Sequence, residues 1–129
     1  MEVDRRTSLG LIGAGATGLL AAWPAEARQD RPAVVLYDAR FGEAAREAAA
    51  WAQRGAIAIE TRRQDIGNAW RGMIARRLAD GGGAVCGVTL YADQMISAAM
   101  GRDHGLRLVH LRSDPARDGG ATLFRWVLA

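Results

Sequence analysis

The sequence predicts a small doubly wound α/β domain with a mostly parallel sheet: four parallel strands, a C-terminal edge strand and helices on both faces. The chain has 129 residues, the length of one domain, and half of them are apolar, which is enough for one core. Beyond residue 32, short apolar runs alternate with longer segments of helical periodicity in the order βαβαβαββ. This alternation is typical of parallel sheets with helical crossovers.

The first predicted strand is "AVVLYD", residues 33–38. It is apolar without alternation, as expected for a strand that is covered on both faces. Right-handed crossovers then favour the strand order 2-1-3-4, with the last strand as an antiparallel edge or hairpin partner. The other strands are predicted at residues 56–60, 84–90, 106–112 and 121–129.

Three helices are predicted between these strands, at residues 42–55, 68–83 and 91–105. Gly55 and the glycines at 81–83 are natural helix stops, and Asn68 is placed to cap the second helix. The apolar residues expected to face the sheet are Ala45, Ala48, Ala49, Trp51 and Ala52 in the first helix, Trp70, Ile74 and Leu78 in the second, and Met95, Ile96, Ala99 and Met100 in the third.

The N-terminal 27 residues have the organisation of a cleavable export signal. Arg5-Arg6 form a basic element, residues 9–23 are uncharged, and Ala25-Glu26-Ala27 is a small-residue cleavage site after the helix-breaking Pro24. The uncharged stretch has 15 residues, and an ordinary membrane span needs about 20. We therefore expect a signal peptide over residues 1–27 and a single α/β domain over residues 28–129.

This segment resembles a twin-arginine (Tat) signal peptide. Arg5, Arg6 and Leu9 match the family's pattern, and Ser8 stands where an apolar residue is usual. The resemblance implies export to the periplasm, with the twin-arginine translocase and signal peptidase as partners and no stable membrane anchor after cleavage. The general secretion route stays open because of Ser8. The remainder of the chain resembles small exported bacterial α/β proteins of uncharacterised function, and its layout resembles half of a uroporphyrinogen-synthase-like or flavodoxin-like domain.

The same residues contain a second pattern, the G-x-G-x-x-G of Gly13, Gly15 and Gly18, with Asp38 20 positions further on. In a Rossmann domain such glycines cradle a dinucleotide and the acid binds the ribose. Two features oppose this alternative: "DRRTSLGLI" is a poor strand, and Pro24 interrupts the required helix. A cytoplasmic dinucleotide-binding protein is therefore the weaker hypothesis.

Composition sets limits on the partners. The formal net charge is +3 and all 17 basic residues are arginines, which are scattered rather than clustered, so we do not predict nucleic-acid binding. The single cysteine, Cys86, excludes an internal disulfide and lies in a predicted central strand, where a small apolar role is expected. Apart from the glycine pattern at residues 13–18, the sequence shows no cofactor motif, and it shows no metal-ligand spacing or G-x-S-x-G nucleophile motif.

In a doubly wound sheet, ligands bind beyond the carboxyl ends of the strands. We therefore expect an arginine-rich rim there that holds a small anion or an acidic periplasmic protein, and the chain to be an exported accessory or binding protein. The alternative is a minimal periplasmic enzyme in which Asp38 or His110 is the base and Arg40 and Arg112 hold an anion. The candidate ligand-binding residues are Asp38, Arg40, Thr89, Tyr91, Asp93, His110 and Arg112.

Overall fold

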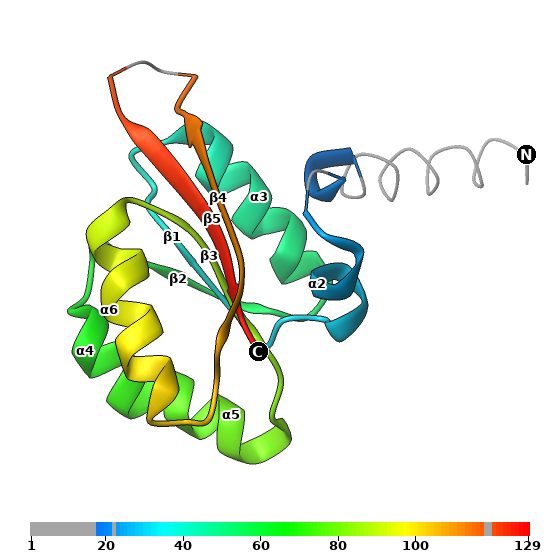
Figure 1. Cartoon of the computed structure of the whole chain (residues 1–129), viewed down its shortest axis with the longest axis vertical. Coiled ribbons are helices and arrows are strands. Elements are labelled where there is room, and N and C mark those ends of the chain that lie inside the picture. The colour runs from blue at the N-terminus through cyan, green and yellow to red at the C-terminus, as the bar shows by residue number, and fades with distance from the viewer. Residues whose placement is uncertain (1–17, 22, 118–119) are drawn as a thin grey trace, which may run out of the picture.

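A computed structural model describes residues 18–21, 23–117 and 120–129. These residues form one five-stranded sheet in the order β2-β1-β3-β5-β4 (Figure 1). β1 pairs in parallel with both β2 and β3, while β5 is antiparallel to β3 and to β4. The strands are β1 (Val34–Tyr37), β2 (Ile57–Glu60), β3 (Val85–Thr89), β4 (Leu108–Pro115) and β5 (Thr122–Leu128).

The sheet confirms the α/β class, the predicted 2-1-3 order and the antiparallel hairpin pairing of the last strand, but the prediction of four parallel strands with a C-terminal edge strand is wrong. β5 inserts between β3 and β4, so the fourth strand is the edge. The reason lies in the two sequences. β5 carries apolar residues on both faces, such as Trp126 and Val127, and both are buried. β4 carries His110, Arg112 and Asp114, which keep access to water only at an edge.

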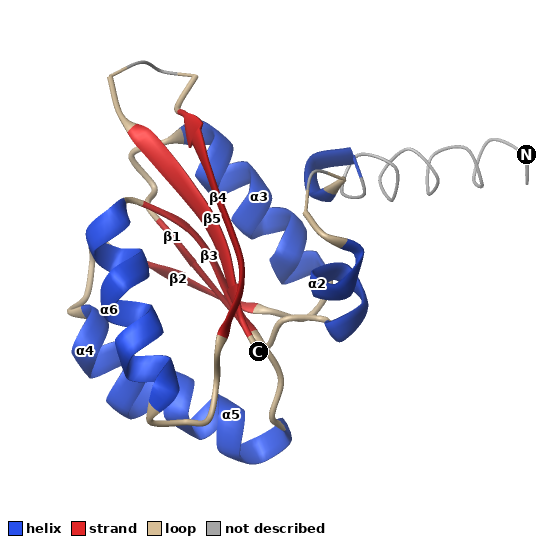
Figure 2. Cartoon of the chain, viewed as in Figure 1, coloured by secondary structure: helices blue, strands red, loops and turns tan. Residues whose placement is uncertain are grey.

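Helices cover both faces of the sheet, as predicted (Figure 2). One face carries α2 (Ala25–Asp30) and α3 (Gly42–Gln53). The other face carries α6 (Tyr91–Arg102) and a continuous helical stretch that consists of α4 (Ile66–Ala69), the π-helical turn η1 (Trp70–Ile74) and α5 (Ala75–Gly81). Within the described ranges, we find no helix with the length and apolar character that crossing a membrane requires.

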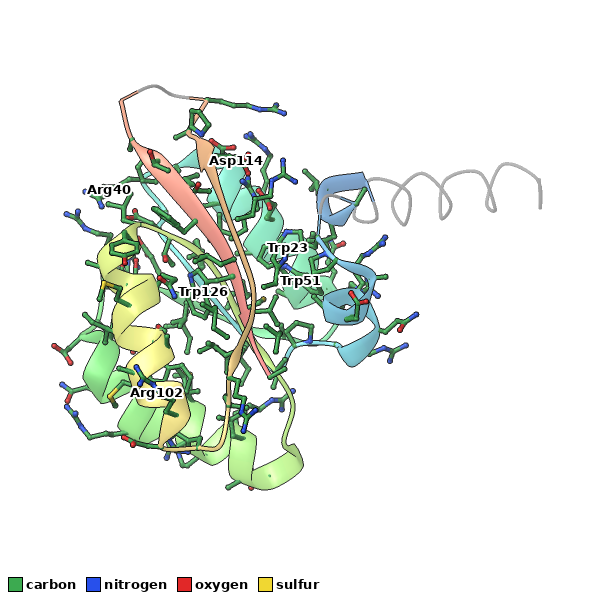
Figure 3. The ribbon with its side chains drawn as sticks, viewed as in Figure 1. Trp23, Arg40, Trp51, Arg102, Asp114 and Trp126 are labelled. Carbon is green, nitrogen blue, oxygen red and sulfur yellow. The ribbon has the colours of Figure 1, made fainter. Side chains whose placement is uncertain are left out.

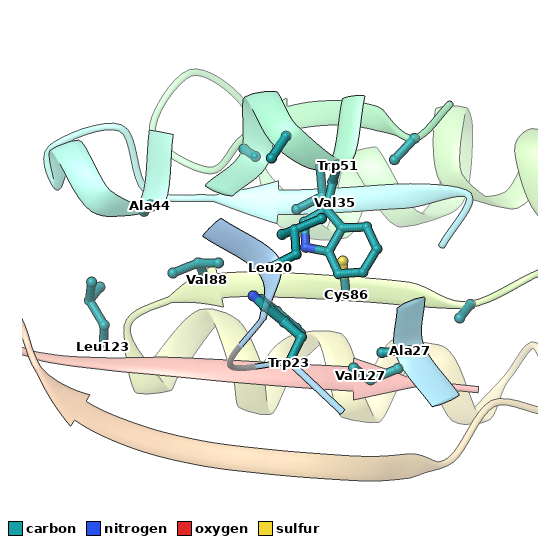
Figure 4. Packing of buried hydrophobic residues seen from close by; sticks show 14 of the residues in the cluster. Leu20, Trp23, Ala27, Val35, Ala44, Trp51, Cys86, Val88, Leu123 and Val127 are labelled. Carbon is teal, nitrogen blue, oxygen red and sulfur yellow. The ribbon is translucent and has the colours of Figure 1, made fainter. Parts of the chain in front are cut away.

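Each face of the sheet has its own hydrophobic core. On the α3 face, Trp51 and Trp23 meet edge to face, with ring centroids 5.4 Å apart (Figure 4). On the α6 face, Trp70 and Trp126 are completely buried. Trp23 belongs to the predicted signal peptide, so the α3-face core includes residues from that segment.

Three details of the predicted helices are wrong. In α3, Ala48 and Trp51 are buried as expected, but Ala49 and Ala52 are exposed. Asp65, rather than Asn68, caps the second helix: its carboxylate accepts the Asn68 backbone N–H at 2.9 Å, and the helix begins at Ile66. In α6, Met95 and Ile96 are exposed rather than inward. Ala99 is exposed too, and of the four residues expected to face the sheet only Met100 packs against the core. The buried positions are Gln94, Ser97 and Gly101.

Candidate functional site

The carboxyl end of β1 and the start of α6 form the centre of the candidate site. β1 lies between β2 and β3 in the sheet. The connection from β1 to β2 covers one face and the connection from β2 to β3 covers the other, so the end of β1 is the switch point of the sheet. The Asp38 N–H donates to the Val88 carbonyl at 3.1 Å, and the Thr61 N–H donates to the Tyr37 carbonyl at 2.9 Å. These bonds fix the ends of the three parallel strands together. α3 and α6 both begin at this end of the sheet, beside Arg40 (Figure 3).

Asp38 and Arg40 form a two-pronged ion pair. The Arg40 guanidinium donates through Nη2 to Oδ2 at 2.6 Å and through Nε to Oδ1 at 3.0 Å, and the Arg40 backbone N–H also donates to Oδ1. Burial by itself raises the pKa of Asp38, but the hydrogen bonds and charge of Arg40 outweigh it and hold the pKa below its usual value. Asp38 is fully buried, whereas about half of the Arg40 side chain is exposed. Arg40 therefore keeps donor capacity toward the solvent.

Asp93, in the first turn of α6, has the opposite electrostatic character. Burial, followed by the negative charge of Asp38, raises the pKa of Asp93. Thr61, Arg40 and Arg62 lower it in part. Two neighbouring carboxyl groups therefore have pKa values that are displaced in opposite directions, an arrangement that also occurs in acid–base sites.

Thr61 is the most informative residue of this group. Its side chain is buried, with 8% of its surface exposed. Its hydroxyl lies beside the Asp93 carboxyl and lowers the pKa of that group through hydrogen bonding, although no partner meets strict hydrogen-bond geometry among the described protein atoms. We name the group Asp38, Arg40, Thr61, Arg62 and Asp93 the β1 rim.

The β1 rim also receives two helix N-termini. The N-cap residues of α3 and α6 are Phe41 and Leu90, and neither forms a side-chain capping hydrogen bond. Each helix has 12 residues, so its first turn presents backbone N–H groups and the positive end of a substantial dipole. Such ends favour anions.

Thr89 and Tyr91 lie near the β1 rim but are committed to packing. The Thr89 hydroxyl accepts the Trp126 indole N–H at 3.0 Å and donates to the Leu90 carbonyl at 2.9 Å. Tyr91 is exposed and packs against Phe124, with ring centroids 5.2 Å apart. Thr89 thus supports the strand end, and Tyr91 points toward β5 rather than toward Asp38.

His110 and Arg112 do not join the β1 rim. Both lie on the edge strand β4, and three strand spacings, roughly 14 Å, separate that strand from β1. The His110 ring lies 6.4 Å from the Trp23 ring on the α3 face. Burial, with a smaller contribution from Arg112, lowers the pKa of His110. Arg112 pairs with Asp114 at 2.9 Å. The predicted single rim is therefore divided between the end of β1 and the edge strand β4.

Arg112 and Asp114 belong to a second polar group, centred on the buried Arg125. The Arg125 guanidinium donates to Glu47 at 2.6 and 2.7 Å, to Asp114 at 3.1 Å and to Glu43 at 3.4 Å. The hydrogen bonds of Glu47 raise the pKa of Arg125. A hollow of about 420 Å³ adjoins this cluster. The charged groups of the Arg125 cluster pair mainly with one another. We therefore interpret the cluster as a structural network rather than as a ligand site.

Arg125, Glu47 and Thr61 were not predicted from the sequence as site residues. One signal was available for Arg125: it is the single charge inside the apolar strand "TLFRWVL", and such a charge requires a buried partner. Glu47 falls on the apolar side of its helix among alanines, which is the matching signal. Nothing in the local sequence distinguishes Thr61 from an ordinary loop residue.

The N-terminal motifs are described only in part. Arg5, Arg6, Leu9, Gly13 and Gly15 lie outside the described residues.

Gly18 lies in a helical turn, and the cleavage-site residues Ala25 and Ala27 lie in α2, where Ala27 is buried. β1 pairs with β2 on one side and with β3 on the other, so no edge of β1 is free for a Rossmann strand that precedes Gly13. This pairing argues against the dinucleotide-binding alternative.

Metal and thiol chemistry find little support in the part of the chain that the structure describes. It contains no group of three or more His, Cys, Asp or Glu side chains arranged to hold a metal ion. Burial, and then the charge of Glu47, raise the pKa of the Cys86 thiol well above its usual value, which disfavours the nucleophilic thiolate.

A comparison with protein-family models, curated proteins and solved structures finds no match to this chain. The functional assignment therefore depends on the geometry of the β1 rim.

Proposed function

We propose that this protein is an exported binding protein that holds a small anion at the β1 rim. The observation that carries the proposal is the half-exposed Arg40 guanidinium at the end of β1, where α3 and α6 begin and where the buried Thr61 hydroxyl lies beside Asp93. Arg40 and Arg62 add positive charge, because both act on the carboxyl groups of the rim. A ligand with anionic oxygens and one further hydrogen-bonding group would use all of these features.

The carboxyl groups limit the class of ligand. Arg40 offsets the charge of Asp38, so Asp38 repels an incoming anion less than a free carboxylate would, although its charge still acts on Asp93. The raised pKa of Asp93 means that its protonated form, which can donate a hydrogen bond to an anion, persists to higher pH than in a free aspartate. We therefore expect tighter anion binding at pH 5 than at pH 8.

The test is a thermal-shift screen of the full chain against phosphate, sulfate, acetate and citrate, with chloride at equal ionic strength as the reference. A ligand at ten times its Kd stabilises the folded state by about 1.4 kcal/mol, which is a rise of several degrees for a chain of this size. Hits are then titrated by calorimetry. Thr61→Val, which keeps the shape and removes the hydroxyl, should weaken binding about 10-fold.

Matched arginine variants separate the site from general charge. Arg62→Gln should weaken binding by a similar factor, and Arg76→Gln, an exposed arginine on α5, should leave it unchanged. Equal losses in the two variants would show non-specific screening and would contradict the proposal. So would the absence of any ligand-specific stabilisation.

The export part of the proposal rests on Arg5, Arg6 and the following uncharged stretch. Replacement of both arginines by lysine keeps the charge and removes the guanidinium pair. It should keep the protein in the cytoplasmic fraction of a bacterium with the twin-arginine system. Unchanged recovery from the periplasmic fraction would contradict the twin-arginine route.

A minimal enzyme is the second candidate, and the opposed pKa displacements of Asp38 and Asp93 favour it. In this alternative Asp93 is the proton donor and Asp38 stays ionised. Asp93→Asn would abolish turnover of a substrate while leaving its binding within a few-fold. If turnover survives this substitution, Asp93 is not the acid.

A further inference from the structure

Residues 18–21 and 23–30 cover part of the α3 face of the sheet, with Leu20, Trp23 and Ala27 turned inward. We name these residues the N-terminal segment. All three inward side chains are at most 2% exposed. They pack in the same core cluster as Trp51, Val88 and Val127 (Figure 4). The segment thus covers this face of the sheet on the side of β5, as α3 covers it on the side of β1. Its described residues contribute no strand to the sheet.

The N-terminal segment makes specific polar contacts with the rest of the domain in addition to its apolar packing. The Trp23 indole N–H donates to the Glu47 carboxylate at 2.9 Å, and its ring meets the edge of Trp51. The same Glu47 oxygen accepts from Arg125 Nε at 2.7 Å, so the acceptor is held in place independently of Trp23. One further bond ties the end of the segment, from the Arg54 guanidinium to the Arg28 carbonyl at 3.0 Å.

The predicted cleavage after Ala27 would remove all three inward side chains. A groove would then be open, with Trp51, Val88 and Val127 facing solvent and Glu47 without its indole donor. An exposed apolar patch with a preformed acceptor is characteristic of a protein-binding surface. The segment that occupies the groove in the uncut chain shows which side chains fit it.

We propose that processing of the exported chain opens a peptide-binding groove between α3 and β5, and that its ligand is a short apolar segment of a partner protein with a leucine and a tryptophan three residues apart. This inference rests on the export part of the proposed function and is independent of anion binding at the β1 rim. Leu20 and Trp23 show the spacing, and the carboxylate of Glu47 selects an indole N–H over a phenyl ring.

The experiment uses the full chain with a specific protease site inserted after Arg31, an exposed residue between α2 and β1. The protein is folded, purified and cut, and a fluorescein-labelled peptide of residues 18–31 is added while anisotropy is followed. We expect saturable binding to the cut protein, competed by unlabelled peptide, and none to the uncut protein, in which the groove is filled. A Trp23→Phe peptide should bind about 10-fold more weakly and a Trp23→Ala peptide at least 100-fold more weakly.

Four results would overturn the inference. The cut protein unfolds or aggregates when the segment dissociates, which makes the segment an obligatory part of the core. The cut protein stays folded and binds no peptide. It pairs with a second copy in sedimentation and excludes the peptide. Finally, the protein recovered from the periplasm of its host retains residues 18–27 by N-terminal sequencing and intact mass, so the groove is permanently occupied.

Discussion

The indole of Trp126 lies directly against the backbone of Gly87, on the neighbouring strand. A Cβ atom at Gly87 would stand 2.1 Å from Trp126 Cζ2. The bare backbone of β3 lets the ring lie flat across the sheet and lets its N–H reach the Thr89 hydroxyl at 3.0 Å. Gly87 and Trp126 therefore fix the end of β3, from which Asp93 follows four residues after Thr89.

Gly87→Ala is expected to destabilise the protein by about 3 kcal/mol, because a rigid ring and two backbones would have to move apart. The measurement is urea unfolding followed by tryptophan fluorescence. Gly72→Ala, in the η1 turn with no atom within 4 Å of its added Cβ, is the matched control and should cost nothing or stabilise slightly. Equal effects of the two substitutions would contradict the packing described here.

Arg125→Met is expected to destabilise the fold by roughly 3 kcal/mol. The substitution keeps an apolar stem and removes the guanidinium, so Glu47 remains buried without its counter-charge. The control is Arg76→Met on the exposed side of α5, which should change stability by less than about 0.5 kcal/mol. If Arg125→Met is as stable as the parent protein, the buried network does not contribute to stability.

Asp93→Asn should stabilise the protein at pH 7 and have little effect at pH 3. The folded protein holds the Asp93 proton to higher pH than the unfolded chain does, because burial and Asp38 raise its pKa. Folding is therefore coupled to proton uptake by Asp93 at pH values above about 4. The stabilisation that protonated Asp93 contributes declines as the pH rises through this range. The measurement is the midpoint of urea unfolding of the parent protein and of Asp93→Asn at the two pH values. A loss of stability at pH 7 in the variant would contradict a raised pKa of Asp93.

Asp38 should contribute with the opposite sign. Arg40 holds the pKa of Asp38 below its usual value, so the stabilisation is present above about pH 4 and is lost as the pH falls through the folded-state pKa. Arg40→Gln should reduce stability more at pH 7 than at pH 2. Identical losses at both pH values would show that Arg40 acts through packing alone.

Cys86 should be inert in the folded protein. The side chain is completely buried and its pKa is raised, so a thiol reagent reaches it only after the core opens. We expect labelling at least about 1,000-fold slower than in 6 M guanidinium chloride, the factor that corresponds to a modest unfolding free energy. Rapid labelling of the folded chain would mean that the α3-face core is open to solvent.

The sequence predicted the strands and helices well because most have an unambiguous apolar pattern. The run "AVVLYD" fits an interior strand, and the crossover rule favours β2 and β3 as its neighbours, which the structure confirms. The position of β5 could not be derived from strand periodicity, since it depends on a comparison of two C-terminal strands. The buried Arg125 in β5, held by Glu47, is what makes an interior place possible for a strand with a charge.

The face of α6 was misjudged for a similar reason. Its methionines and isoleucine form the more apolar side, but the indole N–H of Trp70 needs an acceptor, and Ser97 provides it at 3.2 Å. Gly101 lets the helix approach Leu128, whose Cδ1 lies 3.0 Å from the place where a Cβ would stand. Small and polar residues of α6 thus face the sheet. The need for a hydrogen-bond acceptor and for close packing comes from residues that are distant in sequence, so the pattern of α6 alone could not predict its buried face.

The candidate site was predictable only in part. Asp38, Arg40 and Asp93 were identified because they follow strands, and the structure brings them together. Thr61 joins them only through the pairing of β2 with β1. His110 and Arg112 were assigned to the same place, but the insertion of β5 moves their strand to the far edge.

The most direct test of the proposed anion site is a ¹H–¹⁵N spectrum of the full chain, titrated with the best-binding anion at constant ionic strength. The β1 rim predicts saturable shifts of the backbone amides at residues 40–44, 61–62 and 91–94, with one dissociation constant that Thr61→Val raises about 10-fold. Shifts confined to the hollow beside Arg125, or spread evenly over exposed arginines without saturation, would contradict it.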